Sequence, residues 1–212
     1  LGLARMDPAT FAHEVLVDRL HAAEVVVGKN FTFGHKASGD VATLTELGRR
    51  FGFTVLGLDL ISDHDITFSS TYIRSCIDAG DVAAARAALG RPHRVEGVVV
   101  HGAKRGRQLG FPTANVATPP YTALPADGVY AGWFVIKDRS LPGAISVGTN
   151  PTFSGRERTC EVYVLDVNED FYGFDVAVEF VERLRGMERF DGIEPLIEAI
   201  QRDVQRTREI LS

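Results

Sequence analysis

Residues 102–115, GAKRGRQLGFPTAN, combine residue types that can hold a polyphosphate. Glycines let a backbone approach a ligand closely, and basic side chains beside exposed N–H groups attract negative charge. The residues concerned are Gly102, Gly106 and Gly110 together with Lys104, Arg105 and Arg107. The stretch matches neither GxxxxGK[ST] nor GxGxxG, so it predicts a phosphate loop outside the two common types.

A threonine and an asparagine follow this loop at a spacing that suits a metal ion. Pro112 fixes its own φ and biases Phe111 towards an extended conformation. In an extended segment Thr113 and Asn115 project to the same side and offer a hydroxyl and an amide oxygen, which are hard ligands that Mg²⁺ accepts. A hairpin turn with solvated polar residues has the same spacing, so the pattern alone leaves both interpretations open.

A carboxylate stands on an apolar strand face in RTCEVYVLD, residues 158–166. Alternation places Cys160 and Val162 on one face, and Glu161 and Tyr163 on the other. Burying an unpaired carboxylate is costly, so Glu161 is a candidate general base if a charge partner or a raised pKa accompanies it. Without other information, the pattern favours a simpler alternative, an exposed glutamate on the solvent face.

The segment RLRGMERFDG, residues 183–192, joins the last expected strand to the last expected helix. Its side chains Arg185, Glu188 and Phe190 are of types that can face a flat heteroaromatic ligand. The simpler alternative is a connecting loop.

The first 90 residues alternate between helical and strand patterns, which predicts an α/β unit. Asp7 and Pro8 are typical of a helix start, strands are expected at 24–28 and 53–60, and a helix follows Asp40. Two short helices are expected within 69–90, ended by Gly80 and Gly90. We place the domain boundary at residue 90, giving domains 1–90 and 91–212.

Residues 91–212 change to a period of two, with turns rich in Gly, Pro and Asn. Strands are expected at 94–101, 128–137, 143–149, 158–166 and 175–184, and they predict a small antiparallel barrel. The chain then ends in an amphipathic helix, whose apolar residues include Ile193, Leu196, Ile197 and Ile200.

The bulk composition excludes several classes of protein. With 45% hydrophobic and 24% charged residues in 212, the chain has the composition of a soluble globular protein. A net charge of −5 argues against a general nucleic-acid binder, and the two cysteines form no CxxC pair. Because no signal peptide or membrane span is apparent, we expect a cytoplasmic protein with no membrane partner. The chain begins LGLARM without an initiator methionine, which suggests a piece of a longer protein.

Five stretches resemble riboflavin kinases and occur in the order found in that family. They are GRPHRVEGVVVHGAKRGRQLGFPTAN, GVYAGW, SVGTNPTF, CEVYVLD and FVERLRGMERFDG, and the resemblance covers about residues 90–212. Upstream, VGKNFTFGHKASGD and SSTYIR resemble the second half of the FMN adenylyltransferase module that is fused to such kinases in bacterial bifunctional FAD synthetases.

The resemblance implies a six-stranded Greek-key barrel with a terminal helix, and a Mg²⁺-dependent transfer of the ATP γ-phosphate to the 5′-hydroxyl of riboflavin, yielding FMN and ADP. By the same resemblance, Glu161 is the catalytic base. The residues implied to bind ATP are Gly102, Arg107, Thr113, Asn115, Asp166 and Tyr172, of which Thr113 and Asn115 also hold the metal. The flavin is expected to contact Arg185, Glu188 and Phe190.

The adenylyltransferase resemblance is partial. Four residues match substrate-contacting or motif positions of that module, namely Asn30, Ser70, Thr71 and Arg74, but the printed sequence contains no HxGH motif. We therefore expect kinase activity without FAD synthesis, with small molecules as the partners. The sequence leaves open assembly into a homo-oligomer, and it leaves one rival function, a non-catalytic flavin- or nucleotide-binding module.

Overall fold

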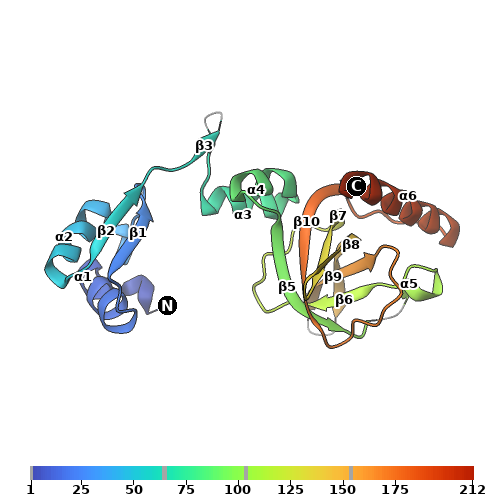
Figure 1. Ribbon diagram of the computed structural model, residues 1–212, viewed down its shortest axis with the longest axis horizontal. Coiled ribbons are helices and arrows are strands. Elements are labelled where there is room, and N and C mark those ends of the chain that lie inside the picture. Colours follow the sequence, from blue (N-terminus) through green and yellow to red (C-terminus); the bar gives the residue numbers. More distant parts are fainter. Residues whose placement is uncertain (1, 64–65, 103–104, 153–154) are drawn as a thin grey trace. The chain divides into compact units, whose positions relative to one another are not determined.

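A computed structural model describes residues 2–63, 66–102, 105–152 and 155–212, in two compact units that divide between Phe68 and Ser69 (Figure 1). The division falls before the boundary expected at residue 90. The reason is that helices α3 (Ser70–Ala79) and α4 (Val82–Leu89) fold in one unit with the barrel, with α4 packed on two of its strands. The assignment of these helices to the adenylyltransferase module stays a prediction.

The first unit is the α/β arrangement that the sequence predicts. Strands β1 (Glu24–Gly28) and β2 (Thr54–Leu58) form a parallel pair. Asp7 caps α1 (Pro8–Phe11) by accepting hydrogen bonds from two backbone N–H groups, and the chain continues in wider π-helical turns, η2 (Ala12–Arg19). Helix α2 (Val41–Phe51) completes the unit. The short elements are η1 (Leu3–Arg5), η3 (His35–Ala37), β3 (Ser62–Asp63) and β4 (Ile66–Thr67).

Glycines and capping side chains set the ends of α3 and α4 as expected. The Ser69 and Asp81 side chains accept hydrogen bonds from the first turns of the two helices. Gly80 and Gly90 end them in the left-handed conformation, with φ of 76° and 68°. The local sequence therefore suffices to place both helices.

The second unit is a closed antiparallel barrel of six strands, with the strand order β10-β5-β6-β9-β8-β7. The strands are β5 (His93–Val100), β6 (Ala114–Ala117), β7 (Gly128–Ile136), β8 (Arg139–Thr152), β9 (Gly155–Val164) and β10 (Asp175–Arg185). Alternate residues point inward, so Tyr130, Phe134, Ile145 and Phe180 are fully buried in the core.

Strand β6 was not among the five strands expected from the alternating pattern. It has only four residues, Ala114 to Ala117, and follows directly on Pro112 and Thr113. Ala114 and Val116 are nevertheless buried, and the short strand closes the barrel between β5 and β9. A four-residue run is too short for a period-two pattern to stand out from a turn.

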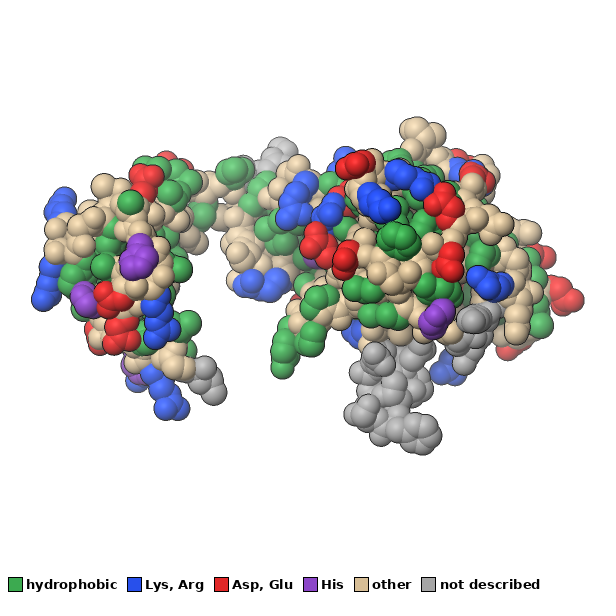
Figure 2. Space-filling view, turned by 60° about the horizontal axis from the view of Figure 1, so that its bottom comes forward, with side chains coloured by type: hydrophobic (Ala, Val, Ile, Leu, Met, Phe, Trp, Pro, Cys, Tyr) green, Lys and Arg blue, Asp and Glu red, His purple; other side chains and the backbone are tan. Residues whose placement is uncertain are grey.

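Besides α3 and α4, two further helices belong to the barrel unit. The short α5 (Arg105–Gln108) lies between β5 and β6 in the chain, and the long α6 (Ile193–Leu211) packs against β7, β8 and β10 (Figure 1). The space-filling view in Figure 2 shows acidic and basic side chains interspersed on the visible face of this unit.

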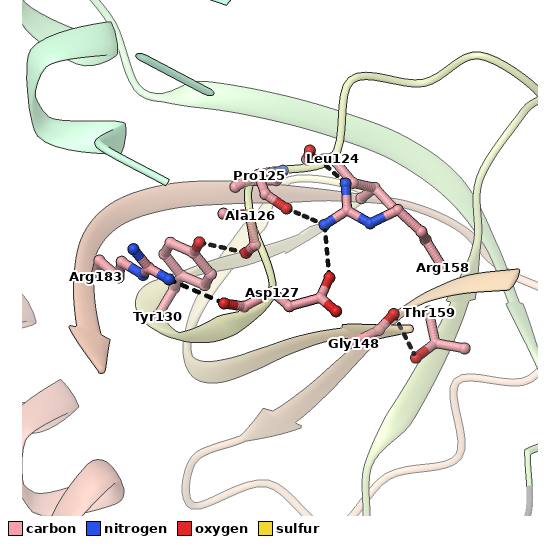
Figure 3. A network of polar contacts seen from close by, with 9 residues as sticks. All are labelled: Leu124, Pro125, Ala126, Asp127, Tyr130, Gly148, Arg158, Thr159 and Arg183. Atoms are coloured by element: carbon pink, nitrogen blue, oxygen red, sulfur yellow. Dashed lines mark hydrogen bonds and ion pairs between the residues drawn. The ribbon is translucent and has the colours of Figure 1, made fainter. Parts of the chain in front are cut away.

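Two arginines bind the connection between β6 and β7 to the barrel (Figure 3), and one of them also bonds to the end of α3. Arg158 on β9 donates to the Leu124 carbonyl and to the Asp127 carboxylate, both at 2.9 Å. Arg183 on β10 donates to the Asp127 carbonyl at 2.9 Å and to the Ala79 carbonyl, at the end of α3, at 3.2 Å. The Arg183–Ala79 bond adds to the packing of α4 on β5 and β10, and together they join α3 and α4 to the barrel.

The barrel depends on a glycine where β7 crosses β10. A Cβ atom at Gly132 would lie 2.0 Å from the Glu179 carbonyl oxygen, so Gly132→Ala should lower the free energy of unfolding by about 3 kcal/mol or more. Urea unfolding followed by the fluorescence of the single tryptophan, Trp133, measures this change. Gly186→Ala is the control, because a Cβ there meets no atom within 4 Å. Equal unfolding midpoints for the two variants would contradict the prediction.

Candidate active site

Two cavities adjoin on the barrel, and Thr113 lines both of them. One cavity, of about 460 Å³, is bounded by β9, the segment after β10 and α6. The other, of about 440 Å³, is bounded by the loop before β6 and by residues 167–172. We call them the aromatic cavity and the loop cavity. The shared threonine lies where ligands held in the two cavities would meet.

Glu161 lies beside Thr113 rather than on a solvent face. Strand β6 pairs with β9 so that Asn115 stands opposite Glu161, and the Glu161 side chain lines the aromatic cavity. The Thr113 hydroxyl donates a hydrogen bond to Glu161 Oε2 at 3.0 Å. The structure thus brings together Thr113 and Glu161, which lie 48 residues apart in the sequence, and places Asn115 opposite Glu161 in the sheet.

The glycines of the 102–115 loop allow the chain to pack on itself. A Cβ at Gly102 would lie 2.4 Å from the Asn115 amide group, and one at Gly106 would lie 2.3 Å from the Phe111 carbonyl oxygen. Gly110 has a φ of 87°. Because Gly102 has no side chain, the Asn115 amide can lie against its backbone. Lys104, expected to add positive charge here, lies outside the described residues.

The loop cavity contains part of the expected ATP set. Arg107, Thr113 and Tyr172 line it, and the His101 ring lies 3.9 Å from the Tyr172 ring, measured between centroids. Gly102 and Asn115 adjoin Thr113 in the chain fold but are not among the lining residues.

Asp166, also expected to bind ATP, lies elsewhere. Its carboxylate forms an ion pair with Arg208 of α6, with Nη2 to Oδ1 at 2.7 Å, and lines neither cavity. The hydrogen bonds from Arg208 hold the pKa of Asp166 below its usual value. The contact of Asp166 with ATP stays a prediction.

The aromatic cavity contains all three residues expected to approach a flavin, namely Arg185, Glu188 and Phe190. Arg185 Nη2 donates to Asp203 Oδ2 at 2.7 Å, and its guanidinium lies 5.6 Å from the centroid of the Phe190 ring. A register shift between Arg183 and Arg185 ends the regular pairing of β10 with β7. The arginine therefore connects the end of β10 to α6.

Three further lining residues were not identified from the sequence. Phe111 and Tyr163 form an edge-to-face pair with ring centroids 5.4 Å apart, and Asp203 of α6 is only 8% exposed. A signal for Asp203 was present, because an acidic residue three positions after Ile200 interrupts the apolar side of the helix. The aromatic pair had no such signal, since its two members lie in different segments.

The residues matched to the adenylyltransferase module lie in different units. Asn30 is in the turn after β1, whereas Ser70, Thr71 and Arg74 occupy the first turns of α3. Their shared role in a nucleotide site stays a prediction.

The donors beside Glu161 fit a magnesium ion that retains water and phosphate ligands. Thr113 and Asn115 supply hard oxygens, the class that Mg²⁺ prefers. Within the described residues no group of three or more His, Cys, Asp or Glu side chains could hold a metal by itself. The residues present therefore suit a metal bound jointly with substrate phosphates and not a closed protein cage.

Comparison with known proteins assigns the chain to a family. The family model described as riboflavin kinase matches residues 89–211, and the family model described as FAD synthetase matches residues 2–72. The chain belongs to the riboflavin kinase family. The six-stranded barrel with its C-terminal helix, preceded by a small α/β region, is the fold expected for this family.

Several curated relatives match most of this chain. All of them are named bifunctional riboflavin kinase/FMN adenylyltransferase. The protein from Bacillus subtilis is 34% identical over 95% of this chain and 64% of its own length. The Escherichia coli protein is 34% identical over 97% and 66%, and the Pseudomonas fluorescens protein is 37% identical over 98% and 67%. The chain thus spans about two thirds of the length of these relatives.

A solved structure also matches. A crystal structure titled as a macrolide-efflux protein from Streptococcus pneumoniae is 34% identical, with a TM-score of 0.81 over 98% of this chain and 66% of that one.

Of the helices described in our structure, none has both the length and the apolar character that a membrane span requires.

The pair of Arg185 and Asp203 should be the main polar fastening of α6. Both side chains are largely buried, so Asp203→Asn leaves the guanidinium poorly paired and should cost about 3 kcal/mol of unfolding free energy. Urea unfolding measures this cost. As a control, Glu198→Gln breaks an exposed pair with Arg202 on the same helix and should leave the midpoint unchanged. A wild-type midpoint for Asp203→Asn would contradict this prediction.

Proposed function

We propose that the barrel unit transfers the γ-phosphate of ATP to the 5′-hydroxyl of riboflavin, with FMN and ADP as products. The observation that carries this proposal is the hydrogen bond from Thr113 to Glu161 at the junction of the two cavities. A phosphate donor and a hydroxyl acceptor held in adjoining cavities would meet beside an oxygen ligand and a proton acceptor. Phosphoryl transfer requires mainly this kind of positioning and charge neutralisation.

The aromatic cavity suits the flavin. Phe111, Tyr163 and Phe190 offer ring faces and edges, and the volume lies within the range of small-molecule sites. Glu161 lines this cavity, so a ribityl chain that extends from a ring bound there would bring its terminal hydroxyl towards the carboxylate.

The loop cavity suits the nucleotide. Arg107 supplies positive charge at one side, and Tyr172 supplies an aromatic surface for a base. Thr113, at the junction, would contact the terminal phosphates, because these must reach the acceptor hydroxyl in the other cavity.

In the proposed reaction, Glu161 accepts the proton of the riboflavin 5′-hydroxyl as the oxygen attacks the γ-phosphorus. The new O–P bond forms while the bond from the γ-phosphorus to the β–γ bridging oxygen breaks, and ADP leaves with that electron pair. Thr113 directs its hydrogen at Glu161, so its lone pairs stay available to a metal ion. Held by Thr113 and Asn115, Mg²⁺ would neutralise charge on the phosphates.

The rival function is a binding module without catalysis. Such a module needs no carboxylate at the junction of two cavities, and the Thr113–Glu161 pair therefore favours the enzyme. Incubation of the chain with riboflavin, ATP and Mg²⁺, followed by chromatography, should yield FMN and ADP in equal amounts. Tight flavin binding with no FMN formed would support the module and refute the kinase.

Glu161 should be required for turnover and not for substrate binding. Glu161→Gln keeps the size and the acceptor for Thr113 but removes the base, so kcat should fall at least about 100-fold. Calorimetric Kd values for riboflavin and MgATP should change less than about twofold, since the contacts elsewhere in the cavities remain. Glu96→Gln, on an exposed barrel strand, is the matched control. Turnover near the wild-type rate in Glu161→Gln would exclude the base role.

We also propose that this chain does not convert FMN into FAD, because its sequence contains no HxGH motif. The second activity would belong to a longer parent protein, in keeping with the bifunctional names of the relatives. Incubation with FMN, ATP and Mg²⁺ should leave FMN unchanged. Formation of FAD and pyrophosphate would contradict this proposal without affecting the kinase proposal.

A further inference from the structure

Acidic side chains outnumber basic ones among the described residues that line the loop cavity. Glu169 and Asp170 line it, whereas Arg107 is the cation among its described lining residues. Asp170 Oδ1 accepts a hydrogen bond from the Tyr172 backbone N–H at 3.1 Å, which fixes the turn. Glu169 remains as a carboxylate at the wall of a cavity proposed to bind ATP, where like charges repel.

Arg139, from outside the cavity, engages both oxygens of Glu169. Its Nη1 donates to Oε2 and its Nη2 to Oε1, each at 2.9 Å. Arg139 begins β8 directly after the two-residue turn from Ile136, so the guanidinium projects from a tight hairpin. The hydrogen bonds from Arg139 lower the pKa of Glu169, which keeps the carboxylate ionised and paired.

This ion pair is not required to anchor the segment that carries Glu169. Phe171 is buried in the barrel core, with its ring 5.0 Å from that of Phe134. Backbone hydrogen bonds join Gly173 and Phe174 to Val99 at 2.9 and 3.1 Å. Both side chains of the Arg139–Glu169 pair are 48% exposed, and exposed pairs contribute little to stability. The pair is therefore not needed to hold the fold, and the feature that distinguishes it is the position of Glu169 at the wall of the loop cavity.

We propose that Arg139 is a positioning residue for ATP, which holds the Glu169 carboxylate in place and neutralises its charge beside the polyphosphate. Arg139 acts through Glu169 and lines neither cavity itself. This inference rests on the proposed function, because it takes the loop cavity as the ATP site. It assigns a role in binding and none in the chemical step.

Removing the two charges separately and together tests this role. Arg139→Gln should raise the KM for ATP and the Kd for MgATP about fivefold, with the KM for riboflavin within about twofold of wild type. Glu169→Gln should bind ATP as well as wild type or better. The double variant Arg139→Gln/Glu169→Gln should recover wild-type ATP affinity. The defect of Arg139→Gln should also shrink as salt is raised from about 0.05 to 0.5 M.

A purely structural role gives the opposite pattern. If the pair only pins the loop, Glu169→Gln should weaken ATP binding as much as Arg139→Gln, and the double variant should show no recovery. Either that pattern or wild-type ATP affinity in Arg139→Gln overturns the inference. Arg94→Gln is the matched control, since it removes the same charge from a partly exposed barrel pair whose members do not line the loop cavity.

The two proposals fail in different ways. Absence of FMN formation by the wild-type chain would refute the kinase activity. Calorimetry with MgATP, which needs no turnover, would still compare the four forms of the Arg139–Glu169 pair and decide the positioning role.

Discussion

The pairing of the short strand β6 with β9 is the contact on which the site depends. It sets Asn115 opposite Glu161 and brings the Thr113 hydroxyl within 3.0 Å of the carboxylate. A shift of this register by one residue would turn Glu161 into the barrel core and Val162 outward, because side chains alternate between the two faces of a strand. Buried pairs between the two strands, Ala114 with Val162 and Val116 with Cys160, hold this register.

The site also requires the backbone around Gly102 and Gly106 to pack closely against neighbouring segments. The loop before β6 folds so tightly that a single methyl group at Gly102 or Gly106 would collide with Asn115 or with the Phe111 carbonyl. Glycine is therefore needed at these positions by the architecture of the loop, whatever ligand it holds. The same contacts fix the orientation of the segment that carries Thr113.

Arginines connect the peripheral elements to the barrel through carboxylates and carbonyls. Arg185 holds α6 through Asp203, and Arg183 holds the end of α3 through the Ala79 carbonyl. The buried pair is expected to matter most for stability, since desolvated partners cannot be replaced by water. Exposed pairs such as Arg139–Glu169 contribute less to stability. The Arg139–Glu169 pair lies beside the loop cavity, where its proposed role is to position ATP.

Elements with strong local signals were predictable from the sequence alone. Caps at Asp7 and Ser69, glycines at 80 and 90, and period-two strands are set by neighbouring residues, so the α/β unit and the barrel were predictable. The motif around Pro112 also made Thr113 a candidate metal ligand, and the lone acid on an apolar strand made Glu161 a candidate base, although the patterns alone left a turn and an exposed glutamate open. The folded structure was needed to show that Thr113 meets Glu161, that Asp203 pairs with Arg185, and that α3 and α4 fold with the barrel. Each of these contacts joins segments far apart in the chain, and local periodicity contains no information about such distances.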